Sequence, residues 1–94
     1  MQISVVIPTC GRRARLLALL QNLDHSSYPV SEVIVVDSGG DKLLSHEYSL
    51  FTNLAIRYMS SEKSVCIQRN TGIRMARSPW IFLCDDDIEI PVDY

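Results

Sequence analysis

The sequence predicts an α/β fold, a Rossmann-like and doubly wound sheet of about four mostly parallel strands. Two observations lead to this prediction. Short runs rich in valine and isoleucine alternate with segments of helical periodicity, as in "ISVVI" followed by "RARLLALLQNL". Within the runs the apolar residues are continuous rather than alternating with polar ones, which is typical of parallel strands buried on both faces.

Four apolar runs are expected to form the strands. The second run, "EVIVVD", ends in the turn "DSGGD", and the fourth, "WIFLC", runs into three acids. The expected strands are Ile3–Ile7, Glu32–Asp37, Leu54–Met59 and Trp80–Cys84. The fourth reads as buried on both faces, like a central strand; if it lies at the end of the sheet order, its unpaired edge invites pairing with another chain.

Three segments between the strands are expected to be helices. The first has leucines on one helical face, namely Leu16, Leu17, Leu20 and Leu23. The third has Cys66, Asn70 and Ile73 at spacings of four and three, which predicts its buried face, and it stops before Pro79. The expected helices are Arg13–Leu23, a weaker one over Lys42–Phe51, and Glu62–Arg77.

Length and composition narrow the class of protein. The chain has 94 residues, so we expect a single domain spanning 1–94, and its net charge of −2 does not favour a nucleic-acid partner. No apolar run approaches the roughly 20 residues that a membrane helix needs. The three cysteines form no C-x-x-C pair, which indicates reduced thiols in a cytoplasmic protein rather than a zinc site or disulfides.

In doubly wound sheets, ligands bind beyond the carboxyl ends of the strands, and we call this side the carboxyl edge. Arg12, Arg13 and Arg15 begin the first helix there, which suits a bound anion, unless they are simply solvated. Asp37 or Ser38 could hydrogen-bond a base or ribose; the alternative is a plain turn. Further along, Arg69 could reach a phosphate, and the alternative for the Arg69-Asn70 pair is a buried polar tie between helix and loop.

The run Asp85-Asp86-Asp87 is the sharpest chemical feature. Three adjacent carboxylates repel one another unless a cation lies among them. A hard divalent ion, Mg²⁺ or Mn²⁺, prefers one or two carboxylates together with phosphate oxygens. If the residues alternate at the strand end, Asp85 and Asp87 share one side and Asp86 faces the other. The alternative is an acidic loop that caps the following turn.

Taken together, "SVVIPTCGR", "VIVVDSGGD" and "IQRNTGIRMARSPWIFLCDDDIEIP" resemble the N-terminal half of family-2-type glycosyltransferases with the GT-A fold. The resemblance extends from Ile3 to Pro91. It implies transfer of a sugar from a nucleotide-diphosphate sugar to an unknown acceptor, by a metal-assisted and inverting mechanism.

The resemblance also implies roles for particular residues. Those that bind the nucleotide sugar would be Pro8, Thr9, Arg12, Asp37, Ser38, Arg69 and Asp85. The D-x-D type metal site would use Asp86 and Asp87, with Asp85 on the ribose side, or in another frame the pair Asp85 and Asp87. Members often carry two acids where this chain has Asp37-Ser38, so a hydroxyl here replaces one carboxylate.

Members of that family continue into an acceptor-binding half, which supplies the general base. We therefore expect 1–94 to be the nucleotide-sugar-binding part, inactive by itself, with the base beyond Tyr94 and the full-length protein peripheral to the membrane. We also expect a homodimer through the exposed strand edge. The alternatives are a non-catalytic module that binds nucleotides or nucleotide sugars, and another doubly wound enzyme such as a nucleotidyltransferase or a phosphatase.

Overall fold

The computed structural model describes residues 3–11, 13–25, 30–39, 45–51 and 53–84. Four strands form one parallel sheet in the order β3-β2-β1-β4, which confirms the predicted α/β class. The strands are β1 (Ile3–Thr9), β2 (Val30–Asp37), β3 (Ile56–Ser60) and β4 (Trp80–Leu83). The helices are α1 (Arg13–His25), α2 (Ser45–Tyr48) and α3 (Val65–Met75).

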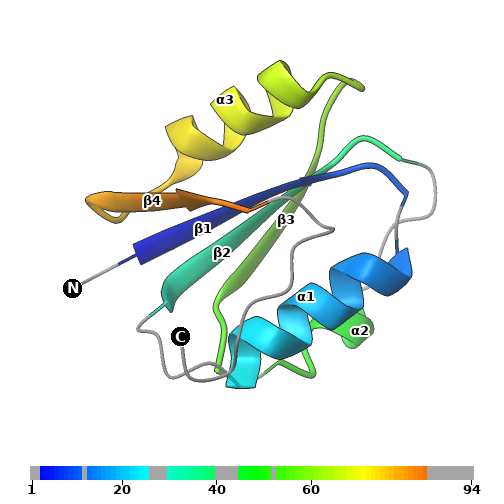
Figure 1. The fold of residues 1–94 in the computed structure, drawn as a ribbon, viewed down its shortest axis with the longest axis vertical. Coiled ribbons are helices and arrows are strands. Elements are labelled where there is room, and N and C mark those ends of the chain that lie inside the picture. Colours follow the sequence, from blue (N-terminus) through cyan, green and yellow to red (C-terminus); the bar gives the residue numbers. More distant parts are fainter. Residues whose placement is uncertain (1–2, 12, 26–29, 40–44, 52, 85–94) are drawn as a thin grey trace.

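The helices lie on both faces of the sheet. In Figure 1, α1 and α2 are on one side and α3 is on the other, so the sheet is doubly wound. β1 and β2 are the central strands, and both are buried along almost their whole length. β1 extends two residues beyond the predicted Ile7, because Pro8 and Thr9 still pair in register with Val36 and Asp37.

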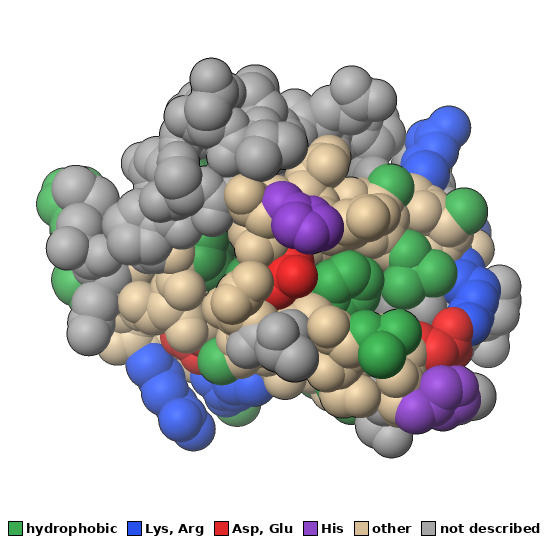
Figure 2. All heavy atoms as spheres, turned by 90° about the horizontal axis from the view of Figure 1, so that it is seen from below, with side chains coloured by type: hydrophobic (Ala, Val, Ile, Leu, Met, Phe, Trp, Pro, Cys, Tyr) green, Lys and Arg blue, Asp and Glu red, His purple; other side chains and the backbone are tan. Residues whose placement is uncertain are grey.

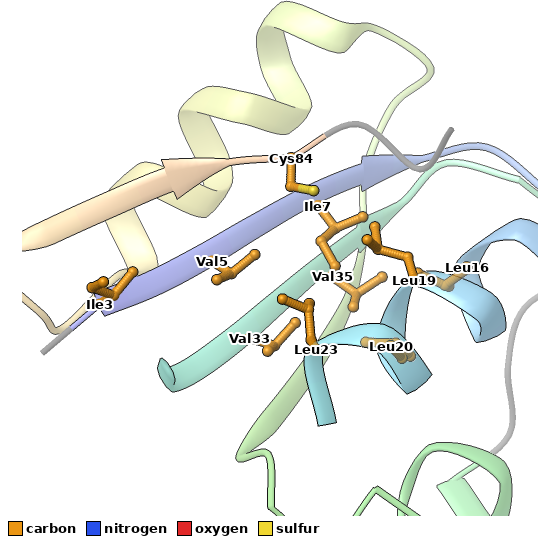
Figure 3. Close-up of a cluster of buried hydrophobic side chains, with 10 residues drawn as sticks. All are labelled: Ile3, Val5, Ile7, Leu16, Leu19, Leu20, Leu23, Val33, Val35 and Cys84. Atoms are coloured by element: carbon orange, nitrogen blue, oxygen red, sulfur yellow. The ribbon is translucent and has the colours of Figure 1, made fainter. Parts of the chain in front are cut away.

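The larger part of the core lies between the sheet and α1. Figure 3 shows the leucines of α1 facing the side chains of β1 and β2 that point to this side. The buried residues of this helix are Leu16, Leu19, Leu20 and Leu23. The predicted apolar face of the first helix is therefore confirmed, with Leu17 only partly buried against the core.

The α3 side has a smaller apolar core and a different inner face from the predicted one. The expected inward residues Cys66, Asn70 and Ile73 are exposed, whereas Gln68 and Gly72 are buried. The prediction for this helix face was wrong because α3 approaches the sheet through a glycine. A Cβ on Gly72 would overlap Cγ1 of Val6 and lie 3.2 Å from its Cβ and Cγ2.

The prediction that β4 is buried on both faces was also wrong. Its four residues, Trp80 to Leu83, are 39% to 59% exposed. β4 pairs with β1 on one side and is the outermost strand on its side of the described sheet. α3 packs mainly on β1 and β2 rather than on β4.

Candidate functional site

The strand order defines where the sheet can receive a ligand. Consecutive strands β1, β2 and β3 progress in one direction, and the chain then returns through α3 to put β4 on the other side of β1. The switch point therefore lies between the carboxyl ends of β1 and β4, which is where doubly wound proteins form a binding crevice. β1 ends there at Thr9, and β4 ends at Leu83, followed by Cys84.

Asp37, at the end of β2, links the loops after β1 and β2 to β3. The residue is 1% exposed. Oδ1 accepts hydrogen bonds from the Gly39 amide at 2.8 Å and the Gly11 amide at 3.4 Å, and Oδ2 accepts one from the Tyr58 hydroxyl. The Tyr58 ring is stacked on Tyr48, with centroids 5.4 Å apart. Asp37 therefore holds the loops in place, and its predicted contact with a base or ribose stays a prediction.

The loops after β1 and β2 touch through two glycines. Gly11 has a positive φ of 63°, a conformation that glycine adopts readily. A Cβ on Gly39 would overlap the Gly11 amide nitrogen and lie 2.6 Å from its Cα. Ser38 joins the same contact, because its amide donates to the Thr9 carbonyl at 3.0 Å. The two loops therefore form one connected backbone surface.

The first turns of α3 complete this surface from the other face. Ser64 is the N-cap, and its hydroxyl accepts a hydrogen bond from the Ile67 amide. Gln68 is buried, and its Nε2 donates to the carbonyls of Thr9 at 2.7 Å and Val36 at 2.8 Å. The predicted residue Arg69 follows directly and is half-buried. Periodicity could not find Gln68, since that method looks for apolar side chains.

The remaining predicted residues fall into two groups. Pro8 and Thr9 are buried at the end of the β1–β2 pairing, and the Thr9 carbonyl accepts hydrogen bonds from the Ser38 amide and from Gln68. Outside the described residues lie Arg12, Asp85, Asp86 and Asp87. Arg13 forms an ion pair with Glu47 of α2, so this basic residue has a partner within the protein.

Cys84 is the last described residue before the acidic run. Its side chain is buried in the core beside Ile7 (Figure 3), and its amide donates to the Val6 carbonyl at 2.9 Å. The parallel pairing with β1 thus continues to Cys84, and the three acids follow next in the sequence. Among the described residues, no group of three or more His, Cys, Asp or Glu could hold a metal ion.

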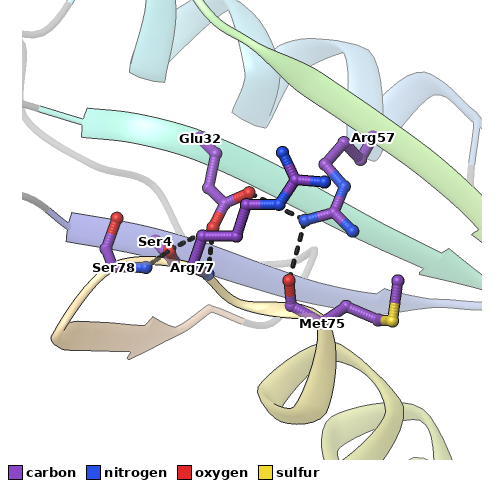
Figure 4. A network of polar contacts seen from close by, with 6 residues as sticks. All are labelled: Ser4, Glu32, Arg57, Met75, Arg77 and Ser78. Carbon is purple, nitrogen blue, oxygen red and sulfur yellow. Dashed lines mark hydrogen bonds and ion pairs between the residues drawn. The ribbon is translucent and has the colours of Figure 1, made fainter.

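A second buried polar cluster lies at the opposite end of the strands (Figure 4). Oε2 of Glu32 accepts from the Ser4 hydroxyl and the Arg77 amide, each at 2.6 Å. Oε1 accepts from Arg57 at 3.0 Å, and the same Arg57 nitrogen donates to the Met75 carbonyl at 2.7 Å. Burial raises the pKa of Glu32, but these donors and the Arg57 charge outweigh it and lower the pKa below its usual value. We call this cluster the Glu32 network; it holds the C-terminal end of α3.

Figure 2 shows one face of the molecule, seen from below. Among the described residues on this face, acidic, basic and hydrophobic side chains are interspersed. Within the ranges that the structure describes, no helix is long and apolar enough to cross a membrane.

The doubly wound sheet and the connected loops at its switch point assign this chain to the class of α/β proteins that bind ligands at the carboxyl edge. Comparison with known sequences then identifies the family within that class. The sequence model of glycosyl transferase family 2 matches residues 4–94, and the chain belongs to this family.

Two similar proteins carry the same family name. An uncharacterised glycosyltransferase of Bacillus subtilis, YwdF, is 33% identical over 89 residues, which cover 93% of this chain and 33% of that protein. An uncharacterised glycosyltransferase of Haemophilus influenzae is 27% identical over 85 residues, covering 90% of this chain and 29% of that protein. The chain thus spans about a third of the length of these relatives.

Solved structures share the fold at lower identity. TarS of S. aureus superposes with a TM-score of 0.82 at 24% identity, covering 99% of this chain and 18% of TarS. TarS 1–349 in complex with UDP-GlcNAc gives 0.80 at 24%, covering 97% and 28%. The mannosyltransferase PcManGT of Pyrobaculum calidifontis, in complex with GDP-Man and Mn²⁺, gives 0.78 at 23%, covering 95% and 28%. These similarities confirm the GT-A type of fold.

Proposed function

We propose that this chain is the nucleotide-sugar-binding part of a glycosyltransferase that transfers a sugar from a nucleotide-diphosphate sugar to an acceptor. The observation that carries the proposal is the switch point between β1 and β4. There the connected loops Thr9–Gly11 and Ser38–Gly39 lie at the carboxyl ends of β1 and β2, and β4, which pairs with β1, leads into the acidic run. The solved relatives that hold UDP-GlcNAc or GDP-Man support a donor of this kind.

The proposed nucleotide site uses backbone groups more than side chains. Since both oxygens of Asp37 already accept hydrogen bonds, this residue would act on the nucleotide by holding Gly11 and Gly39 in place. Ser38 is only partly buried and offers a hydroxyl to a base or ribose. Arg69, close to the N-terminus of α3, would attract the diphosphate, because the positive end of the helix dipole adds to the guanidinium charge.

We propose that a divalent ion, Mg²⁺ or Mn²⁺, is held by Asp86 and Asp87, with Asp85 on the ribose side. The described residues alone offer no ligand set, and the support is that β4 runs to the switch point just before these acids. A bound ion would neutralise negative charge on the diphosphate leaving group. The acidic run would supply carboxylates at the carboxyl edge, where the charge of Arg69 and the N-terminal end of α3 also favour the binding of phosphate.

An inverting transfer requires one displacement at the anomeric carbon and a base that deprotonates the acceptor. Asp37 is an unsuitable base, because it is buried and already hydrogen-bonded. The same observation fits the second candidate function, a module that binds a nucleotide sugar without transferring it. Release of nucleoside diphosphate from a donor in the presence of acceptors, measured on the full-length protein, distinguishes the two, since only a transferase gives turnover.

We also propose that β4 pairs with a second copy of the chain. Its four successive apolar side chains are 39% to 59% exposed, and it is the outermost strand on its side of the described sheet. Exposed apolar edges of this kind readily pair with another chain. Sedimentation should show a concentration-dependent dimer that Ile81→Lys abolishes; a monomer at high concentration would contradict the pairing.

The donor site is tested by calorimetric titration of the chain with UDP, GDP and dTDP, with and without Mn²⁺. We expect binding of at least one nucleotide that depends on the metal and is lost in Asp86→Ala. Asp93→Ala is the matched control, because it removes one carboxylate outside the acidic run. If none of the nucleotides binds with Mn²⁺ present, the proposed function is wrong for this chain.

A further inference from the structure

Gln68 is a buried polar residue to which neither the family match nor the predicted site gives a role. It lies on the inner face of α3 and is 3% exposed. Its side-chain amide has two N–H groups, and Nε2 has two acceptors, the carbonyls of Thr9 and Val36. One side chain therefore joins α3 to the ends of both central strands.

We propose that Gln68 is a positioning residue, whose amide holds the loops after β1 and β2 and the start of α3 in the arrangement that receives the nucleotide. The inference rests on the proposed function and extends it to a residue that need not touch the ligand. Its basis is that Thr9, Val36 and the first turns of α3 all bound the carboxyl edge.

The Thr9 carbonyl links α3 to both loops through hydrogen bonds. It accepts from Gln68 at 2.7 Å and from the Ser38 amide at 3.0 Å. Ser38 directly precedes Gly39, which touches Gly11. A shift of Gln68 would therefore move the contact on which both loops depend. Arg69, the next residue along α3, would move with it.

The other attachments of α3 make this effect local. The Glu32 network holds the C-terminal end of the helix through the carbonyl of Met75 and the amide of Arg77. Gly72 packs closely on Val6 near the middle of the helix. Without the Gln68 amide, we expect α3 to stay on the sheet while its N-terminal end loses its fixed distance from the strand ends.

Gln68→Met is the first test variant, because methionine is unbranched, of similar length, and has no N–H donor. Glu32→Gln is the matched control: it disturbs a buried polar cluster that holds the same helix, at the end remote from the carboxyl edge. In both variants we would measure the melting temperature, hydrogen exchange of the Ser38 and Gly39 amides, and affinity for UDP with Mn²⁺.

We expect both variants to melt at lower temperature. Only Gln68→Met should accelerate exchange at Ser38 and Gly39, and it should weaken UDP binding about tenfold, the equivalent of losing one well-placed hydrogen bond. Glu32→Gln should leave both quantities within about twofold of the unaltered chain, since it leaves the loops in place. If Gln68 had only a structural role, Gln68→Met would lower the melting temperature but would change loop exchange and UDP affinity no more than Glu32→Gln does.

Gln68→Glu adds a readout that depends on pH. At high pH its carboxylate would face two carbonyl oxygens and repel both, whereas the protonated acid can donate to one of them. UDP affinity relative to the unaltered chain should therefore recover as the pH falls from 8 to 5.5. No recovery would count against donation by this side chain.

The exchange measurement separates this inference from the proposed function, because it needs no nucleotide. If the unaltered chain binds no UDP but Gln68→Met still accelerates exchange at the two loops, the positioning role holds and the nucleotide assignment fails. If exchange at Ser38 and Gly39 is unchanged in a folded Gln68→Met variant, the positioning role is overturned. Unchanged UDP affinity in that variant overturns it as well.

Discussion

Gly72→Ala tests how α3 is seated on the sheet. The added methyl group would overlap Cγ1 of Val6, a side chain that is fully buried. Forcing one extra methyl group into a packed interior costs about 1–3 kcal/mol. Replacing a glycine inside a helix by alanine returns about 1 kcal/mol through helix propensity. We therefore expect a net loss of up to about 2 kcal/mol in the free energy of unfolding, the difference between these two effects.

The assay is urea denaturation followed by circular dichroism, with a double-mutant cycle on Val6→Ala. By itself, Val6→Ala removes two buried methyl groups and should cost about 2–3 kcal/mol. In the double variant, the methyl group of Ala at position 72 fills space that Val6 vacated. The two effects should therefore fall short of additivity by about 1–3 kcal/mol. Additive effects of the two substitutions would refute the close packing of Gly72 on Val6.

Three further predictions concern the polar contacts. Glu32→Gln should lower the free energy of unfolding by about 1–3 kcal/mol at pH 7. The pKa of Glu32 is lower in the folded chain than in the unfolded one. The stability that its carboxylate contributes is therefore complete above the unfolded pKa of about 4.3 and is lost as the pH falls through the folded pKa. Denaturation at pH 7 and pH 3 should thus show the difference shrinking in acid, and a constant difference would contradict the lowered pKa. Gly39→Ala should force apart the loops at Gly11 and destabilise the chain by about 1–3 kcal/mol, seen as a fall in melting temperature; an unchanged melting temperature would exclude the contact. Tyr58→Phe removes a donor to the buried Asp37 and should cost about 1–3 kcal/mol in urea denaturation; a loss below about 0.5 kcal/mol would mean that this hydrogen bond contributes little.

The central sheet and the first helix could be predicted from the sequence because their burial follows from apolar side chains alone. The runs "ISVVI" and "EVIVVD" became β1 and β2, and the leucines of α1 face the sheet as their spacing indicates. Family membership was predicted from the order of the motifs and is confirmed over residues 4–94.

The inner face of α3 could not be predicted by the same reasoning. Its contacts depend on a residue without a side chain, Gly72, and on a polar one, Gln68, whereas Ile67 and Ile73 are exposed. Periodicity assigns apolar residues to the interior and so selected the wrong side. The exposure of β4 was missed for a related reason, since an apolar strand reads as buried whether or not a layer covers it in the structure.

The sequence predicts which strand ends meet at the candidate site better than it predicts what each residue does there. Parallel topology puts Thr9, Asp37 and Cys84 at one edge, and this follows from the strand order alone. The role of Asp37 depends on donors that come from distant parts of the chain, Gly11 and Tyr58. Such contacts have no local sequence pattern, so they could be found only in three dimensions.

The proposed function depends on binding of a metal–nucleotide complex at the switch point between β1 and β4. Mn²⁺ is paramagnetic and broadens the NMR signals of nearby amides, so it reports its own location on the isotopically labelled chain with UDP present. We expect strong broadening at Cys10, Gly11 and Cys84, and little at Arg77 and Ser78 beside the Glu32 network. Broadening that is uniform, or strongest at the Glu32 network, would contradict binding at the switch point.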